Sequence, residues 1–254
     1  MNQYSQQGND MNIGIVGAGN IGATLARKLA AADHEVKLAN SKGPESIRDL
    51  AAEVGATATT KEDAVTGVDI VILSIPFSAH RDLANLFANV PESVVVVDTS
   101  NYYPFRDGAI TDVDGGKPEA VWVSEQINRP IIKAWNAALS ATLAEKGVDK
   151  SQPGRIALPV AGDDLEKKSI VMQLVEATGF DALDAGALAT SWRQQPGTPA
   201  YCTELTTDEL QTALEKAEQT RSAGNREALI KVFMEKGDSL THDEIVARNR
   251  AGTA

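Results

Sequence analysis

Short, uniformly apolar runs alternate along this chain with longer segments whose apolar residues recur every three or four positions. Ile13–Val16, Ile70–Leu73 and Val94–Val97 contain no charged residue. Strands that are apolar on both faces are typical of a parallel sheet covered by helices on each side. The segments between them, such as Ile21–Ala31, have the spacing of amphipathic helices. The pattern therefore predicts an α/β protein with a doubly wound parallel sheet.

The same rules predict the remaining elements. Further strands are expected at Glu35–Ala39, Ala56–Ala58, Pro130–Ala134, Ile156–Val160 and Phe180–Ala185. Further helices are expected at Pro44–Glu53, Ser78–Phe87, Glu119–Ile127, Ala138–Lys146 and from Asp164 to Gly179, with a long loop at Tyr102–Gly116. We therefore expect a flexible leader at residues 1–10, a Rossmann domain at 11–128, a small C-terminal α/β domain at 129–203 and a helical tail at 204–254.

The tail differs in character from the rest of the chain. Thr206-x-x-Glu209 and Thr241-x-x-Glu244 are capping-box patterns, which mark helix starts. The tail helices carry apolar stripes although the first ~200 residues already form a complete α/β pattern. We expect these stripes to cover a second subunit in a homodimer; packing on their own subunit is the alternative.

Composition narrows the function. The 254 residues carry a formal net charge of −11, which argues against nucleic acid or a membrane surface as partner. One cysteine, Cys202, excludes an internal disulfide and suits a reducing cytoplasm. The apolar runs are far shorter than the ~20 residues that a membrane helix needs, and no His, Cys or acidic spacing suggests a metal site.

A glycine-rich turn supplies the clearest chemical signal. Gly17-Ala18-Gly19-Asn20-Ile21-Gly22 follows the first predicted strand and opens the first helix. In such a turn the first glycine allows the tight bend and the second lets a pyrophosphate approach the backbone. The third allows the helix to pack close to the strand. The turn and its context predict a dinucleotide site with the phosphates at the helix N-terminus.

The end of the second strand indicates which dinucleotide binds. NAD sites usually place Asp or Glu there to bind the ribose hydroxyls. This chain has Asn40-Ser41-Lys42, with Arg48 one helical turn further on. A hydroxyl and a cation can bind a 2′-phosphate that a carboxylate would repel. We therefore predict NADP(H) as the cofactor.

Other strand ends give the candidate contacts of the nicotinamide and the substrate, because ligands of such sheets lie beyond the carboxyl ends of strands. Ile75, Pro76, Phe77 and Asn101 are predicted to border the nicotinamide. Phe77, His80, Trp135 and Asn136 are predicted to contact the substrate. The strand ends are expected to converge on one acceptor pocket, lined by Phe77, Asn101, Trp135, Asn136 and the Ala185-Gly186 turn. No pair of residues stands out as catalytic.

Six segments together carry a family resemblance: IGIVGAGNIGATLARKLA, ANSKGPES, VILSIPFSA, KAWNAALSATLA, LPVAGDD and DAGALATSWRQQPGTP. From about Met11 to Tyr201 the chain resembles the deazaflavin (coenzyme F-420)-dependent NADP oxidoreductases. It is also similar in plan to the cytosolic domain of the six-transmembrane ferric reductases. The resemblance implies hydride transfer between NADPH and a flavin-like ring. It also implies that Gly17, Gly19, Asn20 and Ile21 hold the pyrophosphate, and that Ser41 and Lys42 hold the 2′-phosphate.

The expected function is thus an NADPH-dependent oxidoreductase whose acceptor is a flavin, a deazaflavin or another small organic molecule. Hydride transfer between two rings needs stacking and orientation more than acid–base groups. Two alternatives remain. One is a related hydroxyacid or imine dehydrogenase, and the other is a non-catalytic NADP-binding sensor.

Overall fold

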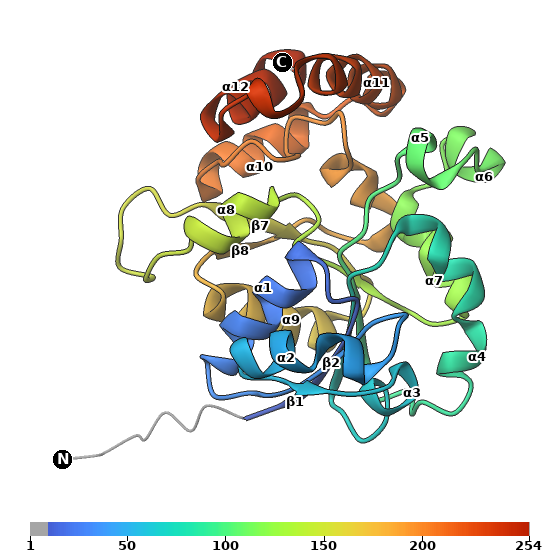
Figure 1. Ribbon diagram of the computed structural model, residues 1–254. Coiled ribbons are helices and arrows are strands. Elements are labelled where there is room, and N and C mark those ends of the chain that lie inside the picture. Colours follow the sequence, from blue (N-terminus) through green and yellow to red (C-terminus); the bar gives the residue numbers. More distant parts are fainter. Residues whose placement is uncertain (1–9, 254) are drawn as a thin grey trace.

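The centre of the molecule is a parallel six-stranded sheet with the order β3-β2-β1-β4-β5-β6 (Figure 1). A computed structural model describes residues 10–253 of the chain. The strands of the sheet are β1 Asn12–Val16, β2 Glu35–Ala39, β3 Thr57–Ala58, β4 Ile70–Leu73, β5 Val95–Asp98 and β6 Ile132–Lys133. The strand order reverses its direction of growth at β1, which confirms the doubly wound fold.

Alternate side chains of the buried strands build two separate cores. Ile70 and Ile72 of β4 face α1 and α9, whereas Val71 and Leu73 face η2, α4 and α7. This two-sided burial explains why β4 is apolar at all four positions. The helices of this region are α1 Asn20–Ala30, η1 Pro44–Ile47, α2 Arg48–Glu53, α3 Lys61–Ala64, η2 Phe77–Asp82, α4 Ala84–Phe87, α5 Pro104–Asp107, α6 Thr111–Asp114 and α7 Glu119–Ile127.

Two local predictions need correction. Residues 78–87 were expected as one helix, but a 3-10 helix, η2, precedes the short α4. The 3-10 geometry places the Phe77 ring in the core, as described below. The segment 102–116 is an irregular connection that contains two single-turn helices, α5 and α6.

The boundary between the first two predicted domains is wrong by one strand. β6 was assigned to the second domain, at residues 129–203, but it pairs with β5 in the main sheet. The second sheet holds only β7 Ala157–Val160 and β8 Asp181–Asp184, which pair in parallel. An antiparallel bridge from Lys133 to Ala161 joins the two sheets. The helices of this part are α8 Ser140–Glu145, α9 Leu165–Ala177 and η3 Leu188–Gln194.

The tail packs on its own chain. It comprises α10 Thr207–Lys216, α11 Gln219–Lys236, η4 Gly237–Ser239 and α12 His242–Thr253. Thr206 and Glu209 form the expected capping box of α10, and Leu210 and Leu214 are buried against Ala157 and Ala200. The stripe of α10 is thus covered by its own subunit, and the homodimer stays a prediction.

The predicted flexible leader lies outside the described residues except for Asp10. Within residues 10–253 none of the helices combines the length and the apolarity needed to span a membrane.

Candidate functional site

The glycine turn has the geometry that its sequence predicts. Gly17 has a φ of +116°, and a Cβ there would lie 2.0 Å from the carbonyl oxygen of Ser74. A Cβ on Gly22 would lie 1.9 Å from the carbonyl oxygen of Gly17, so both positions require glycine. A Cβ on Gly19 would meet no atom within 4 Å. The turn is therefore closed towards the protein and open at its middle glycine.

This open side faces a cleft of about 580 Å³ at the carboxyl ends of β1, β2 and β4. Seven of the predicted cofactor residues line it: Gly17, Ala18, Gly19, Asn40, Ser41, Ile75 and Pro76. Val16, Lys61, Ser74, Ala79, Asp82 and Leu83 complete the lining and were not predicted as site residues. Lys61 begins α3 directly after β3, and β3 pairs with β2. A position just beyond the end of a neighbouring strand was the signal that could have identified it.

The remaining predicted cofactor residues lie around this cleft. Asn20 is exposed at the start of α1, and Ile21 packs against the core. Lys42 is exposed on the turn after β2, where its backbone N–H donates to Asn40 Oδ1 at 3.0 Å. Arg48 forms an ion pair with Glu45, so its charge is already matched.

The residues of the cleft fit a dinucleotide pyrophosphate. The first backbone N–H groups of a helix carry partial positive charge and lack intrahelical partners. The first turn of α1 contains no acidic residue, and Gly19 leaves free space beside it. An anion can therefore approach the start of α1 without steric or electrostatic opposition.

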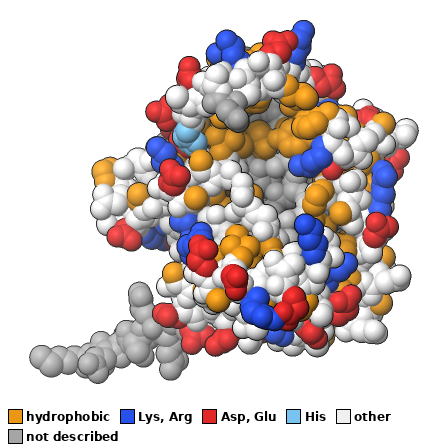
Figure 2. All heavy atoms as spheres, in the orientation of Figure 1, with side chains coloured by type: hydrophobic (Ala, Val, Ile, Leu, Met, Phe, Trp, Pro, Cys, Tyr) orange, Lys and Arg blue, Asp and Glu red, His pale blue; other side chains and the backbone are white. Residues whose placement is uncertain are grey.

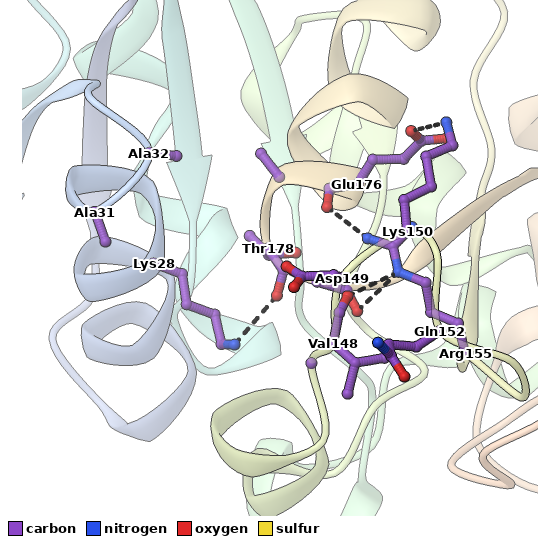
Figure 3. Close-up of a pocket in the computed structure, with 13 residues that line it drawn as sticks. Lys28, Ala31, Ala32, Val148, Asp149, Lys150, Gln152, Arg155, Glu176 and Thr178 are labelled. Carbon is purple, nitrogen blue, oxygen red and sulfur yellow. Dashed lines mark hydrogen bonds and ion pairs between the residues drawn. The ribbon is translucent and has the colours of Figure 1, made fainter.

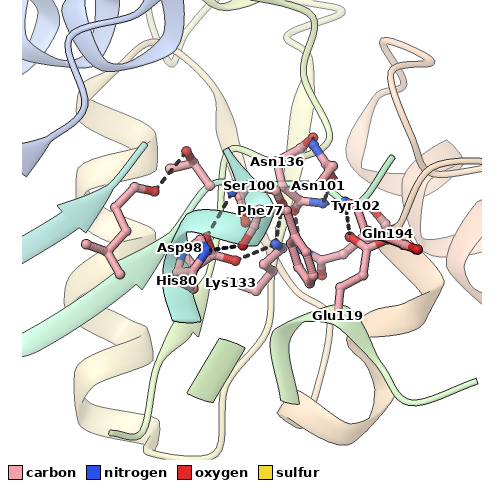
Figure 4. Close-up of polar contacts among 12 residues, drawn as sticks. Phe77, His80, Asp98, Ser100, Asn101, Tyr102, Glu119, Lys133, Asn136 and Gln194 are labelled. Atoms are coloured by element: carbon pink, nitrogen blue, oxygen red, sulfur yellow. Dashed lines mark hydrogen bonds and ion pairs between the residues drawn. The ribbon is translucent and has the colours of Figure 1, made fainter. Parts of the chain in front are cut away.

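A buried polar cluster occupies the ends of β5 and β6 (Figure 4). Lys133 Nζ donates to Asp98 Oδ2 at 2.6 Å and also to the carbonyl oxygen of Ser100. Asp98 Oδ1 accepts from the Ser100 N–H at 3.0 Å. Burial opposes the charge of Asp98, but the Lys133 charge and hydrogen bonds from His80 and Lys133 bring its pKa well below the usual range. The cluster therefore holds a charged pair inside the protein.

Phe77 and His80, which were predicted to contact the substrate, have side chains that are fully buried in this structure. The Phe77 ring stacks on Trp122 with centroids 4.8 Å apart. His80 Nδ1 donates to the Phe77 carbonyl at 2.8 Å, and its Nε2 lies 3.3 Å from Asp98 Oδ1. Both side chains therefore pack in the core beyond the carboxyl end of β4.

Trp135 also turns away from the predicted pocket. A φ of +56° directs its indole to the α9 side, where Nε1 donates to Thr178 Oγ1 at 3.1 Å and 1% of the residue is exposed. In the Ala185-Gly186 turn, the Gly186 carbonyl accepts from the Gly162 N–H. The structure thus uses this tryptophan for packing.

Asn101 and Asn136 come together as predicted. Asn136 Nδ2 donates to Asn101 Oδ1 at 3.0 Å, and Asn101 Nδ2 donates to the Asn136 carbonyl at 2.9 Å. Gln194 Nε2 donates to Asn136 Oδ1 at 2.8 Å. Asn101 is partly exposed, whereas Asn136 is buried. Two amides from different strand ends therefore form a fixed pair beyond the charged cluster.

Glu119, which sequence reasoning missed, lies beside this group. It is buried at the start of α7, and its Oε2 accepts from the Tyr102 N–H at 3.1 Å. Burial raises the pKa of Glu119 to about 7, although the charges of Lys133 and Arg226 lower it in part. Its distance from any motif explains why the sequence did not reveal it.

A second hollow, of about 650 Å³, lies at the opposite edge of the sheet (Figure 3). It is formed by the C-terminal ends of α1 and α9, which lie near the starts of the strands. Its cations already have partners: Lys28 donates to the Thr178 carbonyl at 3.1 Å, and Arg155 pairs with Asp181 at 2.8 Å. It therefore lies away from the carboxyl ends of the strands, and its cations Lys28 and Arg155 are already held by protein groups.

The doubly wound sheet and its open glycine turn define a Rossmann-type dinucleotide-binding protein. Residues 12–102 match the family model described as "NADP oxidoreductase coenzyme F420-dependent". The putative protein YjhV of Escherichia coli is 37% identical over 98 residues, which are 39% of this chain and 72% of that protein. The chain belongs to this NADP oxidoreductase family.

Two further likenesses extend beyond the matched segment. The crystal structure of the hypothetical protein SMa0349 from Sinorhizobium meliloti superposes with a TM-score of 0.67 and 30% identity. It covers 77% of this chain and 95% of that one. The metalloreductase STEAP3 of Rattus norvegicus is 25% identical over 179 residues, 70% of this chain but 34% of that protein. The chain thus spans about a third of STEAP3.

Proposed function

We propose that this protein is an NADPH-dependent oxidoreductase that transfers a hydride between NADP(H) and a small organic acceptor. The observation that carries the proposal is the cleft at the ends of β1, β2 and β4. Its glycine turn is open at Gly19, and its rim carries Ser41 and Lys61. Backbone N–H groups, a hydroxyl and a cation are the partners that phosphates prefer.

The preference for NADPH over NADH follows from the end of β2. Asn40 replaces the carboxylate of NAD sites, and its side chain is bonded to Ser46 Oγ at 2.8 Å. The cleft lining contains one carboxylate, Asp82, and it belongs to η2, not to the end of β2. Ser41 and the neighbouring lysines remain to bind a 2′-phosphate.

The reaction needs orientation more than proton transfer. When bound, the reduced nicotinamide supplies a hydride, and the acceptor takes it together with a proton from solvent. Ile75 and Pro76 border the cleft, and the Asn101–Asn136 pair fixes the neighbouring strand ends. His80 and Lys133 each contact the buried Asp98, and Lys133 also donates to the carbonyl of Ser100, the residue before Asn101.

The test combines binding with turnover. Fluorescence titration measures the dissociation constants of NADPH and NADH, and we expect NADPH to bind at least about tenfold more tightly. NADPH oxidation is then followed with a flavin, a deazaflavin, quinones and ferric chelates as acceptors. Equal affinities would overturn the cofactor preference. Tight NADPH binding without turnover of any acceptor would indicate a sensor. NADPH oxidation by an imine, or NADP⁺ reduction by a hydroxyacid, is assayed in parallel, and turnover there would indicate the related dehydrogenases.

We also propose a homodimer through the tail as the assembled form. Apart from α10, the tail helices keep apolar residues only partly buried outside the pocket described below, such as Val232 of α11 and Ile245 of α12. Light scattering that gave a mass near the 26.9 kDa of one chain at micromolar concentration would reject it.

A further inference from the structure

An apolar pocket lies under the tail helices, and we call it the tail pocket. It has a volume of about 320 Å³. Its lining consists of Tyr103, Phe105, Pro196, Gly197, Tyr201, Arg226, Leu229, Ile230, Phe233, Met234 and Asn249. Figure 2 shows hydrophobic side chains gathered beneath α11 and α12, around a hollow that opens between these helices and the rest of the molecule. Pockets of about 300 Å³ are large enough for a small organic ligand.

The walls are aromatic and remain open to solvent at the rim. Phe105 is 63% exposed and Met234 is 67% exposed, which is unusual for large apolar side chains. On the inner side, Tyr103 Oη and Tyr201 Oη lie 2.6 Å apart, so the two phenols are bonded to each other. A flat apolar molecule can stack on such rings without displacing any hydrogen bond.

The pocket has one charged group at its inner end. Arg226 is 8% exposed, and within residues 10–253 its Nε has no hydrogen-bond partner. Its guanidinium lies over the Tyr102 ring at 5.3 Å, and its Nη2 is 3.5 Å from Glu227, whose side chain is 68% exposed. Glu119 contributes a further acidic group nearby, and burial raises its pKa to about 7. A nearly buried guanidinium with a free donor is suited to an anion.

The tail pocket is a separate site from the cofactor cleft, because the two linings share no residue. Tyr103 follows Asn101 by two residues, and Pro196 follows Gln194 by two residues, so the pocket is next in the chain to the amides that bond Asn136.

We propose that the tail pocket binds a small planar aromatic anion whose negative group pairs with Arg226. This site does not depend on the proposed function.

The pocket is tested without any cofactor, with 8-anilinonaphthalene-1-sulfonate as a fluorescent aromatic anion. Its neutral counterpart, N-phenyl-1-naphthylamine, serves as the uncharged probe. Arg226→Gln should weaken binding of the sulfonate roughly tenfold and leave the amine unchanged, because a charged hydrogen bond is lost. Ile230→Trp should weaken both probes by filling the pocket. Lys231→Gln, an exposed neighbour on α11 outside the lining, should change neither.

The outcomes are distinct. Equal sulfonate affinity in all four proteins would overturn the site. Loss of binding as protein concentration rises would show that a second copy covers the pocket, and would also overturn it. If Arg226→Gln does not fold, the Ile230→Trp variant tests the site alone, and unchanged binding of both probes to it would overturn the site.

Discussion

The two halves of the strand-end edge are built in different ways. At β1, β2 and β4 the cleft is formed mainly by backbone: a tight turn, a helix start and an open glycine. At β5 and β6 the space is filled by side chains, with Asp98, Lys133 and His80 buried together. The first half leaves a cleft that a ligand can occupy, whereas the charged groups of the second half already bind one another's atoms through Asp98. A change in the first should therefore alter binding, and a change in the second should alter stability.

The largest expected effect is a loss of stability when the charged pair of Asp98 and Lys133 is broken. Lys133→Met removes the cation and leaves Asp98 buried, which should lower the free energy of unfolding by about 3–5 kcal/mol. Chemical denaturation measures this loss, and the folded fraction should still bind NADPH. The double variant with Asp98→Asn should recover much of the stability. A loss below about 1 kcal/mol in the single variant would contradict the description of the pair as buried and coupled.

The second expected effect is a loss of stability of the wild-type protein as the pH rises, caused by Glu119. Because the pKa of Glu119 is raised to about 7, the folded carboxyl keeps its proton while the unfolded carboxyl loses it above pH 4.5. Stability should therefore fall as the pH rises from 4.5 to 7, and by about 3 kcal/mol in total. Glu119→Gln cannot ionise and should be more stable than the wild type at pH 8, but similar to it at pH 5.

The matched control for this effect is Glu125→Gln, an exposed position on the same helix. It should show no such difference between pH 5 and pH 8 in thermal unfolding. A Glu119→Gln variant whose stability ran parallel to that of the wild type across this range would show that the carboxyl is ordinary.

The two glycines of the turn sharpen the comparison within the first half. Gly17→Ala introduces a Cβ against the Ser74 carbonyl at a positive φ and should cost about 1–3 kcal/mol of stability. Gly19→Ala meets no protein atom and should leave the melting temperature unchanged, yet it should weaken NADPH binding roughly tenfold by occupying the phosphate space. If both variants lost the same stability, the turn would not be open at Gly19.

The smallest expected effect concerns the cations beside the cleft. Lys42→Ala and Lys61→Ala should each weaken NADPH by about tenfold or less and leave NADH nearly unchanged, because only NADPH carries the 2′-phosphate. Arg48→Gln is the control, since its charge is paired with Glu45. If Lys42→Ala weakened NADH and NADPH equally, this turn would not be the binding site of the 2′-phosphate.

The sequence was sufficient for the backbone-built half. The Gly17–Gly22 spacing and the uniformly apolar strands are local signals, and both depend on a few neighbouring residues. The side-chain half depended on contacts that are distant in sequence. Phe77 was placed at the ligand by its strand end, but Trp122 stacks on it. Trp135 was placed likewise, but Thr178 accepts its indole N–H. No short pattern encodes such partners.

The last helix, α12, uses side chains to hydrogen-bond the backbone carbonyls around the start of the tail. Asn249 donates to the Cys202 carbonyl, and Arg250 donates to the carbonyls of Thr203 and Glu204, 46 and 47 residues earlier. The six strands of the parallel sheet, in contrast, are complete at Lys133. Because synthesis runs from the N-terminus, every strand of this sheet and every residue that lines the cofactor cleft is made before α12. The tail pocket, whose lining includes Asn249 of α12, has all of its residues only after this helix has been made.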